Sequence, residues 1–144
     1  MTGNVSIRRM TPADYDGALA LWVSCGGMSL RSVEDAREGF AAFLVRNPDT
    51  CYAAEADGSL VGTVLAGNDG RRGYLYHVAV GAGYQRRGVG SALVERAMRA
   101  LRRAGIRKTA LVVYGSNLDG NEFWERLGFT VRDDLVYRDK ELLS

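Results

Sequence analysis

The sequence has few of the residues that metal sites and disulfide frameworks require. Its 144 residues include one histidine and two cysteines, Cys25 and Cys51. A single histidine disfavours a zinc site of the histidine–cysteine type, and we expect no metal. Two distant cysteines in a chain long enough to build a core do not form a disulfide framework. We therefore expect both cysteines to be reduced thiols in the core.

Long apolar runs and strong charge of one sign are also missing. No apolar run approaches the roughly 20 residues of a membrane span, and the N-terminus lacks a signal-peptide pattern. Basic and acidic residues number 19 and 17, a net charge of +2, which does not favour general nucleic-acid binding. We expect a cytoplasmic protein with neither membrane nor nucleic acid as a partner. The length suits one domain, residues 1–144.

Two familiar phosphate-binding loops are absent, and a different basic loop is present. Neither the P-loop pattern nor the Gly-x-Gly-x-x-Gly dinucleotide fingerprint occurs. Residues 84–91, Tyr-Gln-Arg-Arg-Gly-Val-Gly-Ser, instead join an apolar run at 74–80 to an amphipathic helix. Helix N-termini carry partial positive charge, and Gly88 and Gly90 let backbone approach a ligand closely. The loop predicts a diphosphate site; a basic turn that merely caps the helix is the alternative.

The rest of the chain predicts one α/β domain with a mixed, mostly antiparallel sheet and flanking helices. The order is β-α-α-β-β-β-α-β-α-β-β. Predicted strands cover residues 5–10, 51–56, 60–66, 73–80, 109–114, 129–131 and 135–138. Predicted helices begin at Thr11, near Ser32, at about Gly88 and at about Asp119, and they end at Gly26-Gly27, Asn47-Pro48, Ala104 and Leu127. Strands 73–80 and 109–114 flank a helix and should be parallel through a right-handed crossover.

Two motifs resemble those of one enzyme superfamily. Gln85-x-x-Gly88-x-Gly90 resembles the acyl-CoA pyrophosphate loop of the GNAT superfamily of N-acyltransferases. Asn117-x5-Phe123-Trp124-x3-Gly128-Phe129, which begins 27 residues after Gly90, resembles a second GNAT segment. With the element order, the resemblance covers most of the chain. The runs Gly62-Thr63-Val64 and Asp69-Gly70-x-Arg72-Gly73 are also similar to the YpeA branch.

The resemblance implies an N-acetyltransferase that moves the acetyl group of acetyl-CoA to a primary amine by direct attack. In this family the strand before the loop splays from the next parallel strand, and the pantetheine arm lies in the gap. The implied cofactor-binding residues are Val78, Ala79, Val80, Gln85, Arg86, Arg87, Gly88, Val89, Gly90, Ser91 and Asn117. The Val78 amide would donate to the thioester carbonyl. Asn117 would contact pantetheine, and it also suits a helix cap.

The catalytic positions depart from the family pattern. Trp124 stands where many members have a tyrosine that protonates the leaving thiolate, and Gly120 replaces the usual alanine. Strand alternation places Tyr74 and Tyr76 on one face, so His77 should point the other way, as a packing residue. We take Tyr76 and Tyr114 as candidate acids. A water chain, or an acceptor whose amine is already neutral, would remove the need for a strong base.

The acceptor and the assembly state stay open. The acceptor, a small-molecule amine or a peptide or protein amine, should meet residues 22–37 and Tyr74. Glu34, Asp35 and Glu38 either attract a cationic amine or form a solvated helix face. Homodimers are frequent in the resembled family. A non-catalytic acyl-CoA-binding or regulatory module on the same fold is the main alternative, and the lack of a P-loop lysine disfavours an ATP site.

Overall fold

A five-stranded sheet forms the centre of the first of two compact units. The computed structural model describes residues 4–26, 30 and 35–142. The units are Met1–Val112 and Val113–Ser144. The first contains β1 (Val5–Arg9), α1 (Tyr15–Cys25), α2 (Arg37–Arg46), β2 (Tyr52–Ala56), β3 (Ser59–Asn68), β4 (Gly73–Val80), α3 (Val89–Arg103) and β5 (Thr109–Ala110), and the second contains α4 (Leu118–Arg126). This is the predicted mixed α/β architecture.

The strands lie in the order β1-β2-β3-β4-β5. Each neighbouring pair is antiparallel except β4 and β5, which are parallel as predicted. Asp57 and Gly58 form the two-residue turn between β2 and β3, and both have positive φ. That conformation is what a tight hairpin requires and what an Asp-Gly pair supplies. Short turns therefore place β2, β3 and β4 side by side, and β4 carries the chain to the basic loop.

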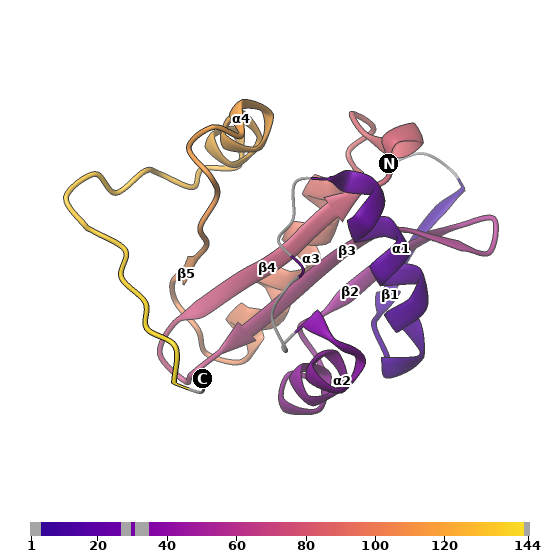
Figure 1. The fold of residues 1–144 in the computed structure, drawn as a ribbon, viewed down its shortest axis with the longest axis horizontal. Helices are drawn as coiled ribbons and strands as arrows, with labels where there is room; N and C mark the ends of the chain where they lie inside the picture. The colour runs from indigo at the N-terminus through magenta and orange to yellow at the C-terminus, as the bar shows by residue number, and fades with distance from the viewer. Residues whose placement is uncertain (1–3, 27–29, 31–34, 143–144) are drawn as a thin grey trace. The chain divides into compact units, whose positions relative to one another are not determined.

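Helices cover the two faces of the sheet in separate layers. Figure 1 shows α1 and α2 on one face and α3 on the other. Between the sheet and the first two helices, Trp22, Phe40, Leu44 and Leu65 belong to a buried apolar cluster. On the other face Leu93 of α3 is fully buried. The α3 helix begins directly after the basic loop, so its buried apolar side holds the loop at one end of the sheet.

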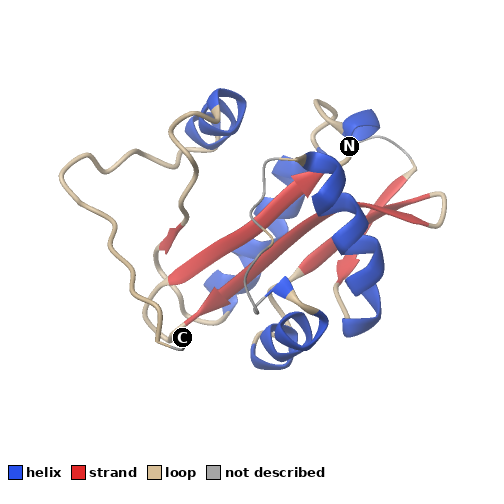
Figure 2. Cartoon of the chain, in the orientation of Figure 1, coloured by secondary structure: helices blue, strands red, loops and turns tan. Residues whose placement is uncertain are grey.

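Three predicted strands differ in the structure. The predicted strand at 109–114 pairs only over Thr109–Ala110, and residues 129–131 and 135–138 are loops (Figure 2). Their β-branched and aromatic residues satisfy strand propensity, but propensity reflects fit to a neighbouring strand, and without a ladder it does not make a strand. In the described part of the chain neither segment forms a ladder.

The start of the second helix also differs from the prediction. Ser32 and Val33, where we expected that helix to begin, lie outside the described residues. The described helix α2 starts at Arg37 and ends where Asn47-Pro48 was expected to stop it. Asp35, just before α2, is described and enters the site below.

Candidate functional site

The loop between β4 and α3 is built by backbone turns that glycine and a side-chain amide hold in place. The 3₁₀ turn Ala82–Tyr84 follows β4. The Gln85 side chain folds back and donates from Nε2 to the carbonyl oxygen of Val80 over 2.9 Å. Gly88 then takes φ 81° and ψ 6° at the helix N-cap, a left-handed conformation that suits glycine. Gln85 therefore closes the loop, and Arg86, Arg87 and Gly88 after it are exposed, whereas Val89 and Gly90 are buried.

The N-terminus of α3 offers backbone N–H groups without competition from side chains. No side chain caps it, and its first turn contains no acidic residue within the described chain. The first amides of a helix have no intrahelical partner, and the first bond here runs from the Ala92 amide to the Gly88 carbonyl. Arg86 and Arg87 stand beside these amides, with Arg87 over the Tyr84 ring at 5.4 Å. The arrangement suits an anion.

The part of β4 nearest the loop has no described pairing with β5. The described parallel pairing joins only Gly73 to Thr109 and Tyr74 to Ala110. At the other end of β4, the Gly81 amide donates to Val61 of β3 over 2.8 Å. Because amides alternate along a regular strand, that of Val80 points away from β3. The amide of Ala79 faces β3, and its side chain is buried in the core.

A β-bulge in β4 changes which side chains face the first two helices. The register with β3 jumps from Thr63–Ala79 to Leu65–Tyr76, so one β3 residue faces two β4 residues. His77 lies at the bulge with φ 47°. Bulges re-aim side chains, and here the imidazole stacks on Trp22 of α1 with ring centroids 4.5 Å apart.

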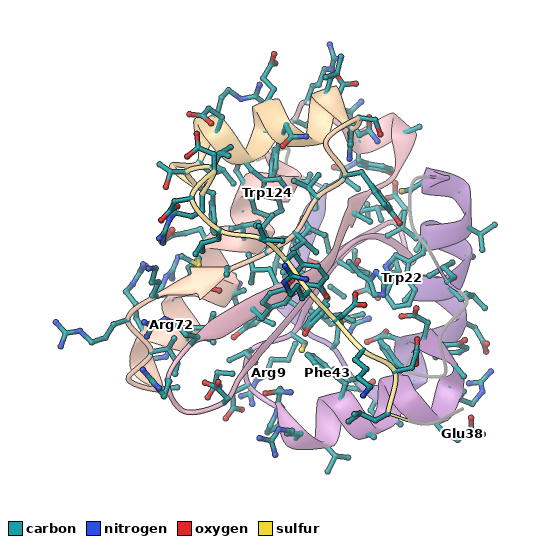
Figure 3. The ribbon with its side chains drawn as sticks, turned by 60° about the vertical axis from the view of Figure 1, so that its left-hand side comes forward. Arg9, Trp22, Glu38, Phe43, Arg72 and Trp124 are labelled. Atoms are coloured by element: carbon teal, nitrogen blue, oxygen red, sulfur yellow. The ribbon has the colours of Figure 1, made fainter. Side chains whose placement is uncertain are left out.

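The expectation that His77 points away from the face of Tyr76 is therefore wrong. Tyr76 contacts Phe43 of α2, and α1 and α2 cover the same face of the sheet. Figure 3 labels Trp22 and Phe43 on these helices. Strict alternation predicts opposite faces for residues 76 and 77, but the extra residue of the bulge interrupts alternation between them.

A chain of hydrogen bonds fixes the bulge and the imidazole. Trp22 donates from Nε1 to Thr63 Oγ1 over 2.9 Å, and Thr63 donates from Oγ1 to the His77 carbonyl over 2.7 Å. The His77 Nε2 lies 2.7 Å from Asp35 Oδ1. Tyr15 donates its hydroxyl to the Asp35 carbonyl over 2.9 Å. The carboxylate of Asp35 thus belongs to a partly buried network and not to a solvated helix face.

The two tyrosines that we took as candidate acids lie in different units. Tyr76 is 45% exposed and contacts the Tyr74 ring at 4.7 Å. Tyr114 belongs to the second unit, and its carbonyl accepts from the Asn121 side chain. Their proposed role stays a prediction.

The second motif folds as a capped helix. Asn117 Oδ1 accepts from the Gly120 amide over 2.9 Å, so the capping role of Asn117 is confirmed. A Cβ at position 120 would lie 2.5 Å from Asn117 Nδ2, which favours glycine beside this cap. Trp124 packs edge-on against Phe123 and Phe129 at 4.9 and 5.0 Å. Trp124 therefore has a packing role, and the pantetheine contact of Asn117 stays a prediction.

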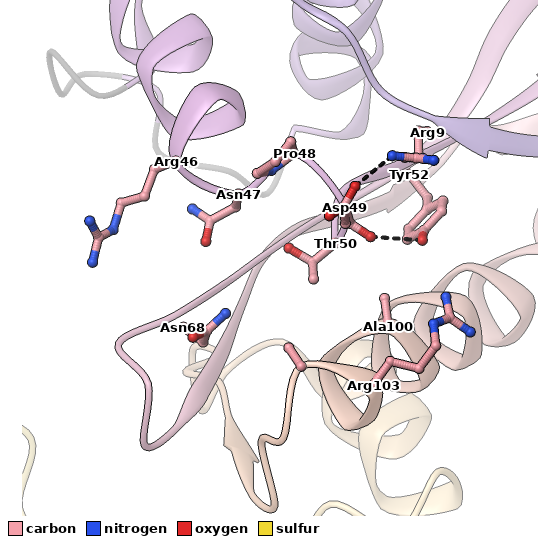
Figure 4. A pocket seen from close by; sticks show the side chains of 11 residues that line it. Arg9, Arg46, Asn47, Pro48, Asp49, Thr50, Tyr52, Asn68, Ala100 and Arg103 are labelled. Carbon is pink, nitrogen blue, oxygen red and sulfur yellow. Dashed lines mark hydrogen bonds and ion pairs between the residues drawn. The ribbon is translucent and has the colours of Figure 1, made fainter.

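A cavity of about 500 Å³ lies at the other end of α3 (Figure 4). It is lined by Arg9, Arg46, Asn47, Pro48, Asp49, Thr50, Tyr52, Asn68, Ala100, Arg103 and Ala104. Arg9 pairs with Asp49 at 2.5 Å. Arg46 and Arg103 lie in the last turns of α2 and α3, where arginine favourably offsets the helix dipole. None of the predicted site residues lines this cavity.

The described residues bear on metal binding, membrane crossing and cysteine pairing. Among them, no group of three or more His, Cys, Asp or Glu side chains is arranged to hold a metal ion. Over the same residues, no helix combines the length and apolarity needed to cross a membrane. Cys51 is buried and Cys25 is half-buried, and both are free thiols.

Comparisons with known proteins match this chain to one family. Residues 17–129 match the acetyltransferase (GNAT) family. An acetyltransferase of Sodalis glossinidius is 30% identical over 140 residues, which is 97% of each chain. Ard1 from Thermoplasma volcanium has a TM-score of 0.80 at 19% identity, covering 90% of this chain and 84% of its own.

A second solved structure, the PaiA N-acetyltransferase from Thermoplasma acidophilum in complex with coenzyme A, has a TM-score of 0.77. Its identity is 21%, and 92% of each chain is covered. These two structures show the likeness of fold, and the family match extends over most of the sequence. The chain belongs to the GNAT family of acetyltransferases.

Proposed function

We propose that this protein transfers the acetyl group of acetyl-CoA to a primary amine. The observation that carries the proposal is the uncapped N-terminus of α3, preceded by Gly88 in a left-handed conformation and by two exposed arginines. Membership of an acetyltransferase family supports it, and so does the coenzyme A complex of the similar PaiA structure.

The residues of the loop fit a pyrophosphate. The amides from Arg86 to Ser91 would hold its oxygens, and the charges of Arg86 and Arg87 would balance its own. Gln85 would act mainly by closing the loop on Val80. Because the first turn of α3 lacks an acidic side chain in the described chain, no carboxylate there repels an anion.

The edge of β4 fits an extended ligand that carries amide groups. The Val78 and Val80 amides would pair with pantetheine as an added strand does, and Asn117 would contact the same arm. Ala79 would contribute only backbone, since its methyl group is in the core. When bound, acetyl-CoA supplies a thioester-activated acetyl group. The Val78 amide would donate to its carbonyl oxygen, where negative charge develops during acyl transfer.

The geometry adds His77 to the candidate catalytic residues. The bulge aims its imidazole toward the first two helices, next to Val78 in sequence. His77 Nε2 is hydrogen-bonded to Asp35, so Nδ1 is the nitrogen that would take the proton of the attacking amine. Tyr76 and Tyr114 remain the candidates for protonating the thiolate.

The non-catalytic alternative has one observation in its favour. Trp124 has no titratable proton, and its ring is packed between Phe123 and Phe129. A module that only binds acyl-CoA needs neither an acid nor His77, so turnover separates the two functions.

The test is acetyl transfer to a panel of amines, followed by thiol release and by mass spectrometry of the acceptor. We expect multiple turnovers with at least one small-molecule or peptide amine. His77→Gln should reduce kcat roughly 100-fold, since general-base catalysis typically contributes that much or more. Tyr76→Phe and Tyr114→Phe test the acid, and full turnover in both would remove the two tyrosines from the mechanism. Acetyl-CoA binding without turnover on any amine would support the non-catalytic module.

A further inference from the structure

We propose that Asp35 is a positioning residue, which fixes the protonation pattern of the His77 ring and so makes Nδ1 the proton acceptor. The inference rests on the proposed acetyl transfer. It assigns a role in the reaction to the chain just before α2, far in sequence from the loop and β4.

The contact between Asp35 and His77 is short and partly shielded from water. Asp35 Oδ1 lies 2.7 Å from His77 Nε2, and the side chains of Asp35 and His77 are 13% and 18% exposed, respectively. A carboxylate accepts hydrogen bonds, so Nε2 must carry the hydrogen. In a neutral imidazole the other nitrogen, Nδ1, then has the free lone pair.

Both partners are held by their surroundings. Trp22 stacks on the imidazole, and Thr63 bonds the His77 carbonyl. Tyr15 of α1 bonds the Asp35 carbonyl and carries the Arg37 guanidinium over its ring at 4.8 Å. A side chain that is already fixed in this way loses little conformational entropy during the reaction. This is the usual arrangement of a positioning group.

The proton balance of the step is simple. The attacking amine forms its bond to the acetyl carbon and loses a proton to His77 Nδ1, while the carbon–sulfur bond of the thioester breaks and coenzyme A leaves as a thiolate that takes a proton from an acid side chain or from solvent. The Asp35 carboxylate stabilises the imidazolium through its hydrogen bond to Nε2, as an aspartate does for other catalytic histidines. The proton then leaves Nδ1 for solvent, and the neutral imidazole is restored.

Asp35→Asn is the decisive variant because it keeps the size of the side chain. Asparagine can donate its amide to Nε2, which favours the hydrogen on Nδ1 and removes the basic lone pair there. We expect kcat to fall at least tenfold while KM for acetyl-CoA stays within twofold of the wild type. The matched control is Asp16→Asn, which removes an exposed carboxylate that pairs with Arg37 at 2.7 Å. It should leave kcat unchanged.

The ring itself can be observed directly because the chain has one histidine. In protein labelled with ¹⁵N-histidine, we expect the Nε2–H form to dominate the neutral imidazole of the wild type and of Asp16→Asn. In Asp35→Asn the Nδ1–H form should rise several-fold. This readout needs no turnover and reports directly on the Asp35–His77 contact in the folded protein, while kcat reports whether that contact serves the reaction.

A double-variant cycle completes the test. If Asp35 acts through His77, then His77→Gln with Asp35→Asn should be no slower than His77→Gln alone, within twofold. An unchanged tautomer in Asp35→Asn, or a loss that multiplies with that of His77→Gln, would overturn the role of Asp35. Failure of the proposed function looks different: the wild type would acetylate no amine, whereas the tautomer spectra would still decide whether Asp35 positions His77.

Discussion

The rings of Trp22 and His77 stack with their centroids 4.5 Å apart, although they are 55 positions apart in the sequence. Thr63, on the strand next to His77, joins the two by accepting from Trp22 Nε1 and donating to the His77 carbonyl. One buried hydroxyl therefore links α1, β3 and the bulge of β4.

Replacing Thr63 with valine should show how much this hydroxyl contributes to the stability of the fold. The Thr63 side chain is fully buried, so the change leaves the Trp22 N–H without its partner and frees the His77 carbonyl. We expect the free energy of unfolding to fall by about 1–3 kcal/mol, the usual result of leaving a buried polar group unpaired. Denaturant unfolding measures this fall. Thr63→Ser keeps the hydroxyl and should lose less; an equal loss in both variants would contradict the role of the hydroxyl.

The conformation of Gly88 predicts a position-specific effect of adding a methyl group. Nothing lies within 4 Å of a Cβ built on Gly88 or on Gly83, but Gly88 has φ 81°. Gly88→Ala should therefore destabilise the fold by about 1 kcal/mol through backbone strain alone. Gly83→Ala, three residues after the end of β4, should change stability by less than about 0.5 kcal/mol. Thermal unfolding of the two variants checks the difference, and equal losses would count against a strained Gly88.

The Arg8–Asp14 pair predicts how one part of the stability depends on pH. Arg8 donates two hydrogen bonds to the Asp14 carboxylate, at 2.9 and 2.8 Å, and these hold the pKa of Asp14 below its usual value. The pair therefore stabilises the fold fully above the unfolded pKa of aspartate, about 4. That contribution is lost as the pH falls through the lower folded value.

Asp14→Asn tests this pH dependence. The variant should be less stable than the wild type at pH 7, and the gap should shrink as the pH falls below about 4. Urea unfolding at a series of pH values measures the gap. A gap that stays constant or widens in acid would show that the pair does not act as we describe.

Burial predicts very different reactivity for the two cysteines. Burial raises the pKa of the Cys51 thiol to about 11, so little thiolate is present at pH 8. Cys25 is half-buried, and its thiol points to the carbonyl oxygen of Val80. Iodoacetamide should modify Cys25 much faster than Cys51, because the thiolate is the reactive form and the Cys51 side chain is also buried. Peptide mass spectrometry gives both rates, and Cys25→Ser should leave almost no early labelling. Fast labelling of Cys51 in the folded protein would contradict its burial.

Local sequence patterns predicted much of the fold. Turn residues such as Asp57-Gly58 set the hairpin between β2 and β3, and the apolar stripe of α3 set which side it buries. These features depend on residues near one another in the chain. The segment 129–131, predicted as a strand but a loop in the structure, shows the limit of local patterns. Whether a β-prone segment becomes a strand depends on a partner strand that the local pattern does not specify.

The candidate site could likewise be predicted from the sequence only in part. The loop from Gln85 to Ser91 was recognisable because glycine and arginine act there through backbone conformation and charge. The contact of His77 with Asp35 was not predictable, because the bulge that creates it depends on the register between β3 and β4. A single histidine on a strand next to the loop was the one available signal, and alternation led to the opposite orientation.

Calorimetric titration with acetyl-CoA tests the central claim most directly, since the proposed function requires that the loop before α3 bind this molecule. The loop variant is Gly88→Glu. The control is Gly105→Glu, which adds the same charge at a glycine of similar φ, +87° against +81°, beyond the other end of α3. We predict that the wild type and the control bind with micromolar affinity or tighter, about −8 kcal/mol, and that Gly88→Glu binds at least 100-fold more weakly. Failure of the folded wild type to bind acetyl-CoA, or binding of ATP in its place, would contradict the account.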